Sequence, residues 1–150
     1  MTEAVKTPWH LWVIGLVALL WNSGGAYDYT MTQTRNMDYL ATAATNAGVP
    51  LDTLVGYYTN FPLWADAMWA FGVWGAVAGS ILLLVRSKFA FHAFVLSLVG
   101  LLGTTVFTMT SDIPAELDSP FTWIFTAVIW IVTAALAYYA RRMTAAGVLR

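Results

Sequence analysis

The sequence predicts an all-α integral membrane protein, a four-helix bundle with short periplasmic helices between its first and second membrane spans. Two observations predict this class. Four long apolar stretches fill most of the chain, and the charged residues lie almost entirely between them. Hydrophobic residues make up 59% of the chain and charged residues 10%, whereas a soluble domain carries about 25% charged residues. Most of the surface therefore need not meet water, and residues 1–150 suit a single membrane domain.

Each apolar stretch is long enough to cross a bilayer, because a hydrocarbon core of about 30 Å needs about 20 helical residues. The sequences Ser119-Pro120 and Asn60 with nearby Pro62 mark helix starts, where a polar cap and a first-turn proline are favourable. The very short turn between the second and third stretches predicts an antiparallel hairpin, and an up-down bundle follows. The predicted spans are residues 8–27, 61–85, 89–109 and 120–140.

The first stretch has a second interpretation as a cleavable secretory signal. Residues 11–20 have the length of its apolar region, and the small residues 23–26 suit a cleavage site. However, Lys6 is the only cation before the stretch, and Glu3 offsets its charge. We therefore expect a retained membrane span.

The cations predict the orientation. All seven Lys and Arg residues except Arg35 fall on one side of the predicted bundle. Because positively charged loops stay in the cytoplasm, this pattern predicts a multi-pass protein of the bacterial inner membrane with both termini cytoplasmic. The connection 28–60 and the acidic connection after the third span would then face the periplasm.

The connection 28–60 is predicted to hold two short helices over the periplasmic mouth of the bundle. Asn36 can cap the segment MDYLATAATNA, and Gly48 can end it. Pro50 then restarts the chain, and PLDTLVGYY can form the second helix. The alternative is an irregular loop.

Small residues on the second span predict close helix packing. Gly72, Gly75 and Gly79 form one flat stripe at helical spacing, and the latter two make a GxxxG pair that lets another backbone approach. The pattern does not say whether the neighbouring helix belongs to the same chain. We favour a partner within the chain.

A few polar residues near the predicted periplasmic face are candidates for ligand binding. Asp66 is the best ionisable candidate, because it lies about one turn inside the second span, where an ionised side chain is costly unless it has a function or a partner. The alternatives for Asp66 are a structural acid at a helix start and a salt bridge to a partner subunit. For Asn22 the alternative is a hydrogen bond between helices. The candidate ligand-binding residues are Asn22, Asp28, Arg35, Asp66, Trp21 and Trp69.

Several functional classes lack support in the sequence. The chain has no cysteine and only two histidines, so it offers no thiolate chemistry and little for a metal. Its net charge of −1 offers no basic face to nucleic acid. No catalytic or phosphate-binding motif is present. We therefore expect a non-enzyme with no catalytic residues, no metal and no cofactor.

Three segments, WNSGGAYDYTMTQTRNMDYL, FPLWADAMWAFGVWGAVAGSILLLVRS and FTAVIWIVTAALAYYARRM, with the terminal GVLR, carry a resemblance. They resemble a family of small four-helix inner-membrane proteins of proteobacteria whose function is poorly characterised and which are often labelled sugar transporters. The most distinctive part is Trp21-Asn22, then Gly25, Asp28 and TQTRN. Residues 41–56 depart from the family, in which a shorter connection follows TQTRN. The resemblance implies four spans and a transport role.

Three functions remain open from the sequence. We favour the binding or transport of a small polar solute at a periplasm-facing pocket of polar and aromatic residues. The alternative is a non-catalytic accessory subunit of a larger membrane complex, and a weaker one is a binder of lipid or of a hydrophobic cofactor. The expected partners are the lipid bilayer, a small polar solute, and a second copy of the chain or a larger membrane complex.

Overall fold

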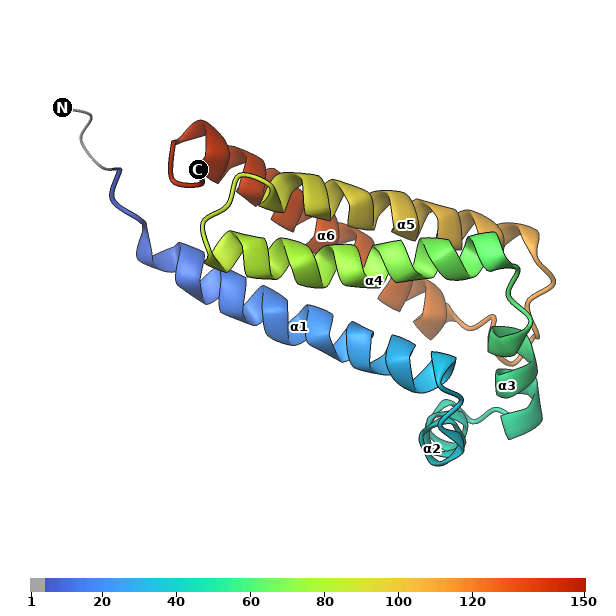
Figure 1. Cartoon of the computed structure of the whole chain (residues 1–150). Coiled ribbons are helices and arrows are strands. Elements are labelled where there is room, and N and C mark those ends of the chain that lie inside the picture. Colours follow the sequence, from blue (N-terminus) through green and yellow to red (C-terminus); the bar gives the residue numbers. More distant parts are fainter. Residues whose placement is uncertain (1–4) are drawn as a thin grey trace.

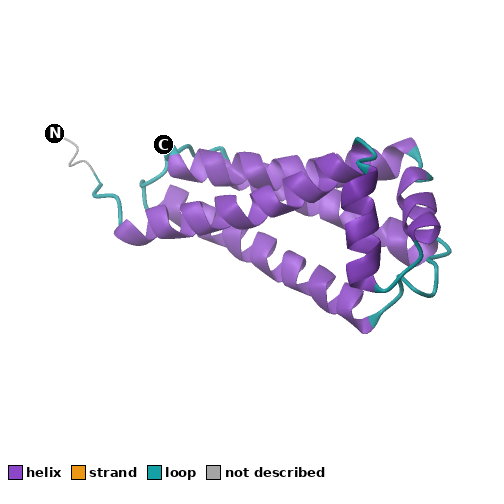
Figure 2. Ribbon diagram, turned by 90° about the horizontal axis from the view of Figure 1, so that it is seen from below, coloured by secondary structure: helices purple, strands orange, loops and turns teal. Residues whose placement is uncertain are grey.

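The computed structural model describes residues 5–150, and these residues form six helices and no strand (Figures 1 and 2). Residues 1–4, which the predicted domain 1–150 includes, lie outside the described residues. An all-helical chain is therefore confirmed. The helices are α1 (Trp9–Gln33), α2 (Met37–Ala47), α3 (Leu51–Thr59), α4 (Leu63–Leu84), α5 (Ala90–Thr110) and α6 (Pro120–Ala145).

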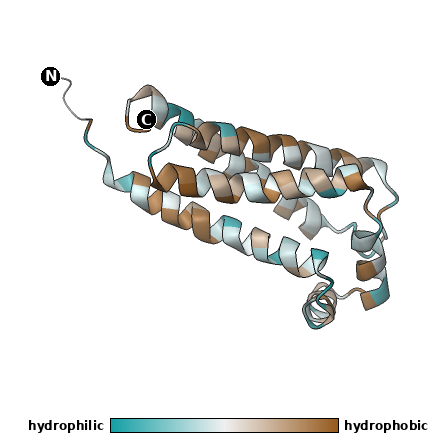
Figure 3. Cartoon of the chain, viewed as in Figure 1, coloured by the Kyte–Doolittle hydropathy of each residue, from teal (hydrophilic) through white to brown (hydrophobic). Residues whose placement is uncertain are grey.

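Three of these helices, α4, α5 and α6, are long and apolar enough to cross a membrane. The helix α1 has 25 residues but is not among the three. Its second half holds Asn22, Ser23 and Asp28, which lower its mean hydropathy. Figure 3 shows the same change along α1, from apolar near its start to more hydrophilic toward α2.

The helix ends follow local chemistry, with a correction to the sequence analysis at Asn60. The side chain of Asn36 accepts a hydrogen bond from the amide of Tyr39, and Gly48 ends α2 with a φ of 70°, as predicted. Asn60, expected to start the second span, instead ends α3, and its side-chain nitrogen donates to the carbonyl of Gly56 at 2.7 Å. The helix α4 instead begins directly after Pro62. Proline has no amide hydrogen, and none is needed at a helix start.

The helix α1 continues beyond the predicted boundary at residue 27. No proline interrupts it, and it ends only where Arg35 takes a φ of 53° and turns the chain toward α2. The extension brings Asp28 and Gln33 onto the same helix as Asn22. These polar residues are therefore held by regular backbone and not by a loop.

The glycine stripe of α4 lies against α5. A Cβ added at Gly75 would lie 2.9 Å from the backbone nitrogen of Ser97, and one at Gly100 would meet the backbone of Gly72 and Met68. The hydroxyl of Ser97 donates to the carbonyl of Gly72 at 2.5 Å. The neighbour of this stripe is thus another helix of the same chain, and α4 and α5 form a tight hairpin (Figure 1).

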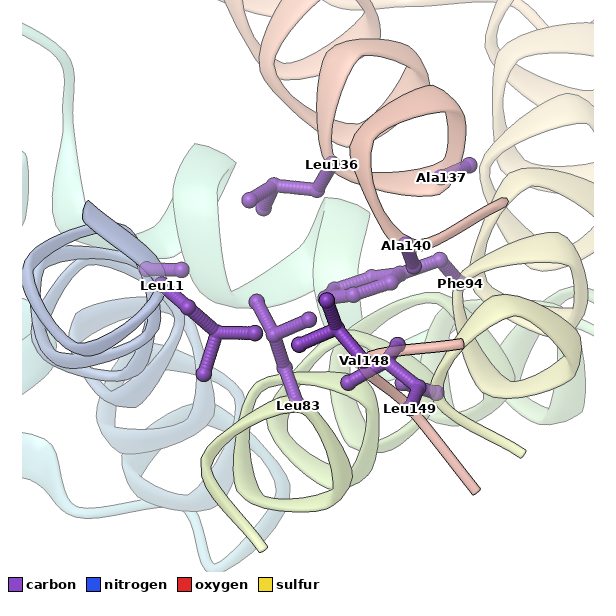
Figure 4. Close-up of a cluster of buried hydrophobic side chains, with 10 residues drawn as sticks. Leu11, Leu83, Phe94, Leu136, Ala137, Ala140, Val148 and Leu149 are labelled. Carbon is purple, nitrogen blue, oxygen red and sulfur yellow. The ribbon is translucent and has the colours of Figure 1, made fainter. Parts of the chain in front are cut away.

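One end of the molecule is closed by an apolar core. Leu11, Leu83, Phe94, Val148 and Leu149 are buried together there, and Figure 4 shows their side chains pointing toward one another from four parts of the chain. Two backbone hydrogen bonds join Arg150 to the turn between α4 and α5. The amide of Arg150 donates to the carbonyl of Arg86 at 2.9 Å, and the amide of Lys88 donates to the carbonyl of Arg150 at 3.0 Å. From this closed end the long helices spread toward the end that carries α2 and α3 (Figures 1 and 2).

The helices α2 and α3 build a small core of their own. Leu40, Ala44, Val49 and Leu54 are buried in it, with Leu117 of the α5–α6 connection packed against them. This second core covers the end at which the long helices spread. The predicted short helices between the first two predicted spans are therefore present.

Candidate functional site

A cavity of about 620 Å³ lies where the long helices spread. Its walls come from α1, α3, α4, α5, α6 and the α5–α6 connection. Four of the six predicted ligand-binding residues line it, namely Trp21, Asn22, Asp28 and Trp69, and Gly72 of the glycine stripe lines it as well. The spread of the helices is what leaves this space, because side chains fill the closed end.

Aromatic rings make up much of the wall. Trp69 of α4 meets Tyr58 at a centroid distance of 5.6 Å and Phe61 at 5.9 Å, which ties α4 to the end of α3. On the opposite side, Trp21 of α1 meets Phe125 of α6 at 6.1 Å. All five residues line the cavity. Rings of this kind give a ligand large contact area with little loss of side-chain freedom.

The serine and threonine hydroxyl groups in the wall already donate to backbone carbonyls. Ser97 donates to Gly72, and Thr122 donates to Leu117. The threonines that donate within their own helix are Thr104, Thr105, Thr108, Thr126 and Thr133. Such bonds satisfy a hydroxyl proton that has no water nearby. What these groups offer a ligand is therefore the hydroxyl oxygen, an acceptor.

Asn22 holds α1 against α4 from inside the wall. Its side-chain nitrogen donates to the hydroxyl of Ser80 at 2.9 Å and to the carbonyl of Ala76 at 3.3 Å, and the residue is buried. Ser80 in turn donates to the carbonyl of Ala76. This is the interhelical role that the sequence left open. The side-chain carbonyl of Asn22 is the part that remains for a ligand.

Asp28 lies at the exposed mouth of the cavity. Its Oδ1 accepts a hydrogen bond from the hydroxyl of Tyr39 on α2 at 2.7 Å. Burial, and then this bond to Asp28, raise the pKa of Tyr39 well above its ordinary value. Burial, followed by the negative charge of Asp28, raises the pKa of Tyr58 to about 12. The carboxylate of Asp28 is therefore fixed from α2 and acts electrically on α3.

The remaining two predicted residues, Arg35 and Asp66, are not among the lining residues. Asp66 sits in the first turn of α4, where the helix dipole favours an acid. It accepts a hydrogen bond from the side-chain nitrogen of Gln33 at 3.1 Å. Arg35 forms the left-handed end of α1. These two residues therefore lie outside the cavity lining that the other four share.

The sequence analysis did not predict the contact between Trp123 and Asp118, two residues of the cavity wall. The indole nitrogen of Trp123 donates to Asp118 Oδ1 at 2.7 Å, and both residues line the cavity. The sequence suggested an acidic loop and an interfacial tryptophan, taken separately. The signal that could have joined them is the Ser119-Pro120 helix start between them, since it folds the preceding residue back against the first turn.

The two histidines lie at the closed end of the molecule and do not line this cavity. His10 Nδ1 lies 2.6 Å from the hydroxyl of Tyr139, and the ring of His92 packs on Phe89 and Phe91. Among residues 5–150 there is no group of three or more His, Cys, Asp or Glu side chains placed to hold a metal ion. The cavity is therefore the feature with the clearest capacity to bind a ligand.

Comparison of the chain with protein-family models, with curated proteins and with solved structures found no match.

Proposed function

We propose that this chain is a four-span protein of the bacterial inner membrane that binds a small organic solute in its cavity for transport. The cavity itself is the observation that carries the proposal. Its volume of about 620 Å³ falls in the range of about 300–1,000 Å³ that is usual for small-molecule sites. Aromatic walls with a few fixed polar groups are also usual for such sites.

The packing of α1 supports its role as the fourth span. It lies along α4, where a Cβ added at Gly15 would be only 2.6 Å from Leu84 Cδ2 and where Asn22 bonds to Ser80. Its outer face exposes apolar side chains, among them Leu20 at 76% exposure. Such a face is costly in water and is suited to lipid. A helix that packs along membrane spans in this way would face lipid as they do.

The charges support an orientation with the closed end in the cytoplasm. Arg86 and Lys88 belong to the turn at the closed end, and Arg150 is bonded to that turn. Asp28 and Asp118 lie at the open end. Positive residues favour the cytoplasmic side, so the mouth of the cavity would face the periplasm and accept solute from there.

Transport requires the closed end to open in turn. One four-helix chain is small for alternating access, which commonly uses two structurally related halves. A pair of identical chains supplies two halves, so we propose that the transporting unit is a homodimer.

A cavity-filling substitution tests the binding site. Gly24 and Gly25 line the cavity, and a Cβ added at either would meet nothing within 4 Å. Gly25→Leu should therefore fill part of the cavity without a clash and weaken solute binding by about tenfold or more. Binding is measured by tryptophan fluorescence of the purified protein in nanodiscs, against sugars, polyols, amino acids, quaternary ammonium ions and neutral aromatic compounds.

Gly56→Leu is the matched control. Gly56 is also open around its Cβ position, but it lies on α3 and does not line the cavity. The control should bind like the unaltered protein. Absence of any fluorescence response to the whole panel, or equal binding by both leucine variants, would count against a solute site in this cavity.

A lipid or another neutral apolar molecule is the second candidate occupant. It is favoured by the serine and threonine hydroxyl groups of the wall, which are committed to backbone carbonyls and leave much of the surface apolar. Lipid that copurifies with the unaltered protein and is lost from Gly25→Leu would support this occupant.

A further inference from the structure

The charges of the cavity wall have one sign. Its lining residues include two carboxylates, Asp28 and Asp118, and contain no lysine, arginine or histidine. An anionic solute would therefore meet negative charge at the mouth without a compensating cation. Like charges in a partly desolvated site oppose binding, whereas an opposite charge favours it.

The threonine hydroxyls of the wall show the same preference. The threonine hydroxyls offer their oxygens because their protons are already donated to carbonyls. The indole nitrogen of Trp123 is already donated to Asp118. These threonine hydroxyls therefore meet a bound ligand as acceptors, which suits the positive end of a cation.

Aromatic rings add a third contribution of the same sign. Trp21, Tyr58 and Trp69 line the cavity together with Asp28. The face of each ring carries partial negative charge and attracts a cation within about 6 Å, and tryptophan does so best. Aromatic rings are the usual recognition element for a quaternary ammonium group, and a nearby carboxylate adds charge attraction.

Asp28 is fixed in place for such a role. Tyr39 donates to its Oδ1, so the carboxylate is oriented from α2 while its second oxygen is not used by this bond. The burial of Tyr58, and then the charge of Asp28, raise the pKa of Tyr58, which places that charge within electrical reach of the aromatic wall. A cation bound among the rings would feel the same field.

We propose that the solute of this cavity is an organic cation with an apolar body, held by the aromatic wall and paired with the carboxylate of Asp28. The inference rests on the proposed solute site and names its substrate class. The apolar body lies among the rings and the apolar side chains, and the ammonium group lies toward the mouth. No chemical step is involved, only binding and release.

Two probes of equal shape test the charge preference. Benzyltrimethylammonium and 2,2-dimethylpropylbenzene differ in one atom, nitrogen in place of carbon, and hence in one positive charge. With the full chain in nanodiscs, the cation should bind about tenfold more tightly than its neutral counterpart. Asp28→Asn should remove most of this difference while leaving the affinity for the neutral probe unchanged.

Asp52→Asn is the matched control, because Asp52 is an exposed acid in the first turn of α3 and does not line the cavity. It should keep the full preference for the cation. If Asp28→Asn does not fold, the comparison of the two probes on the unaltered protein decides the proposal alone.

The outcomes separate this inference from the proposed function. Equal binding of the two probes, or tighter binding of the neutral one, overturns the cation preference and leaves a solute site in place. An equal loss of preference in Asp28→Asn and Asp52→Asn overturns the assignment to Asp28. Failure of both probes, with binding of a sugar or polyol that Gly25→Leu abolishes, overturns the inference while supporting the site. Failure of every compound overturns both.

Discussion

At the scale of single residues, the contact between Tyr39 and Asp28 joins the short helix α2 to the long helix α1. The phenol hydroxyl donates to the carboxylate at 2.7 Å. Burial and this bond both favour the protonated phenol, so the pKa of Tyr39 in the folded protein lies above its ordinary value of 10.0. A group that holds its proton more tightly when folded makes folding dependent on pH.

The sign of this dependence gives a testable result. Below about pH 10 the contribution of the retained phenol proton to stability is fully present, and this contribution is lost as the pH rises from the ordinary pKa through the raised one. Tyr39→Phe should lower the stability of α2 at pH 7 by about 1 kcal/mol. The difference between the two proteins should shrink above pH 10. Hydrogen exchange of the α2 amides at pH 7, and proteolysis within α2 at pH 9 to 11, measure it. A difference that stays constant with pH would contradict the role of the phenol proton.

The sequence pointed to four of the residues that line the cavity, but it ranked Asp66, which does not line it, first among the ionisable candidates. Asp28 and Asp66 look alike in the sequence, since each is an acid near the end of an apolar stretch. Their difference arises because α1 does not stop at residue 27. The extra turns place Gln33 beside Asp66, and hydropathy alone cannot locate the end of a helix that becomes gradually more polar.

At the scale of helices, the hairpin of α4 and α5 depends on glycine at places where backbones touch. Gly75 has the backbone of Ser97 and Ala93 within about 3 Å of where its Cβ would be, at 2.9 and 3.0 Å. Backbone cannot move aside as the tip of a flexible side chain can. Shape complementarity of this kind drives helix association in lipid, where there is little hydrophobic driving force.

Gly75→Ala should therefore destabilise the protein by about 1–3 kcal/mol, the usual cost of overpacking. Gly24→Ala is the comparison, since nothing lies within 4 Å of its Cβ position, and alanine there should be neutral or stabilising because it favours helix. Unfolding in mixed micelles by titration with sodium dodecyl sulfate measures both. Equal stability of the two variants would contradict the packing described for this hairpin.

The helical elements themselves were largely predictable because their signals are local. Asn36 and Gly48 bound α2, and Ser119 with Pro120 starts α6, all as the sequence indicates. Asn60 was misjudged because the same residue type can start one helix or end another. The spread of the long helices had no local signal. It depends on which faces pack, and therefore the cavity could be placed only roughly from the sequence.

At the scale of the whole molecule, the arrangement of polar and apolar surface is that of a protein solvated by lipid. Large apolar side chains such as Leu20 and Ile131 are exposed at 76% and 68% along the long helices. Hydrophilic residues gather toward the ends of the long helices and in the connections (Figure 3), and polar residues such as Asn22 and Asp28 line the cavity. If α1 crosses the bilayer together with α4, α5 and α6, the two termini lie on the same side of the membrane. If α1 does not cross, they lie on opposite sides.

The chain contains no cysteine, so single introduced cysteines can report the side of the membrane on which a residue lies. A membrane-impermeant maleimide applied to intact spheroplasts should label Thr45→Cys and Ala115→Cys. It should label Val5→Cys and Ala146→Cys only after lysis. All four positions are exposed in the structure. Labelling of Val5→Cys and Thr45→Cys from the same side would contradict a fourth span formed by α1.

The joining of residues 148–150 to the α4–α5 turn has a consequence for biogenesis. The α4–α5 hairpin is complete once residue 110 has been synthesised, and its contacts are local enough to form as it enters the bilayer. The closed end is different, because Leu11 and Leu83 meet Val148 and Leu149 in one core. During translation that end therefore stays incomplete until residues 148 and 149 have left the ribosome, and a chain that stops before them lacks part of the core that seals this end.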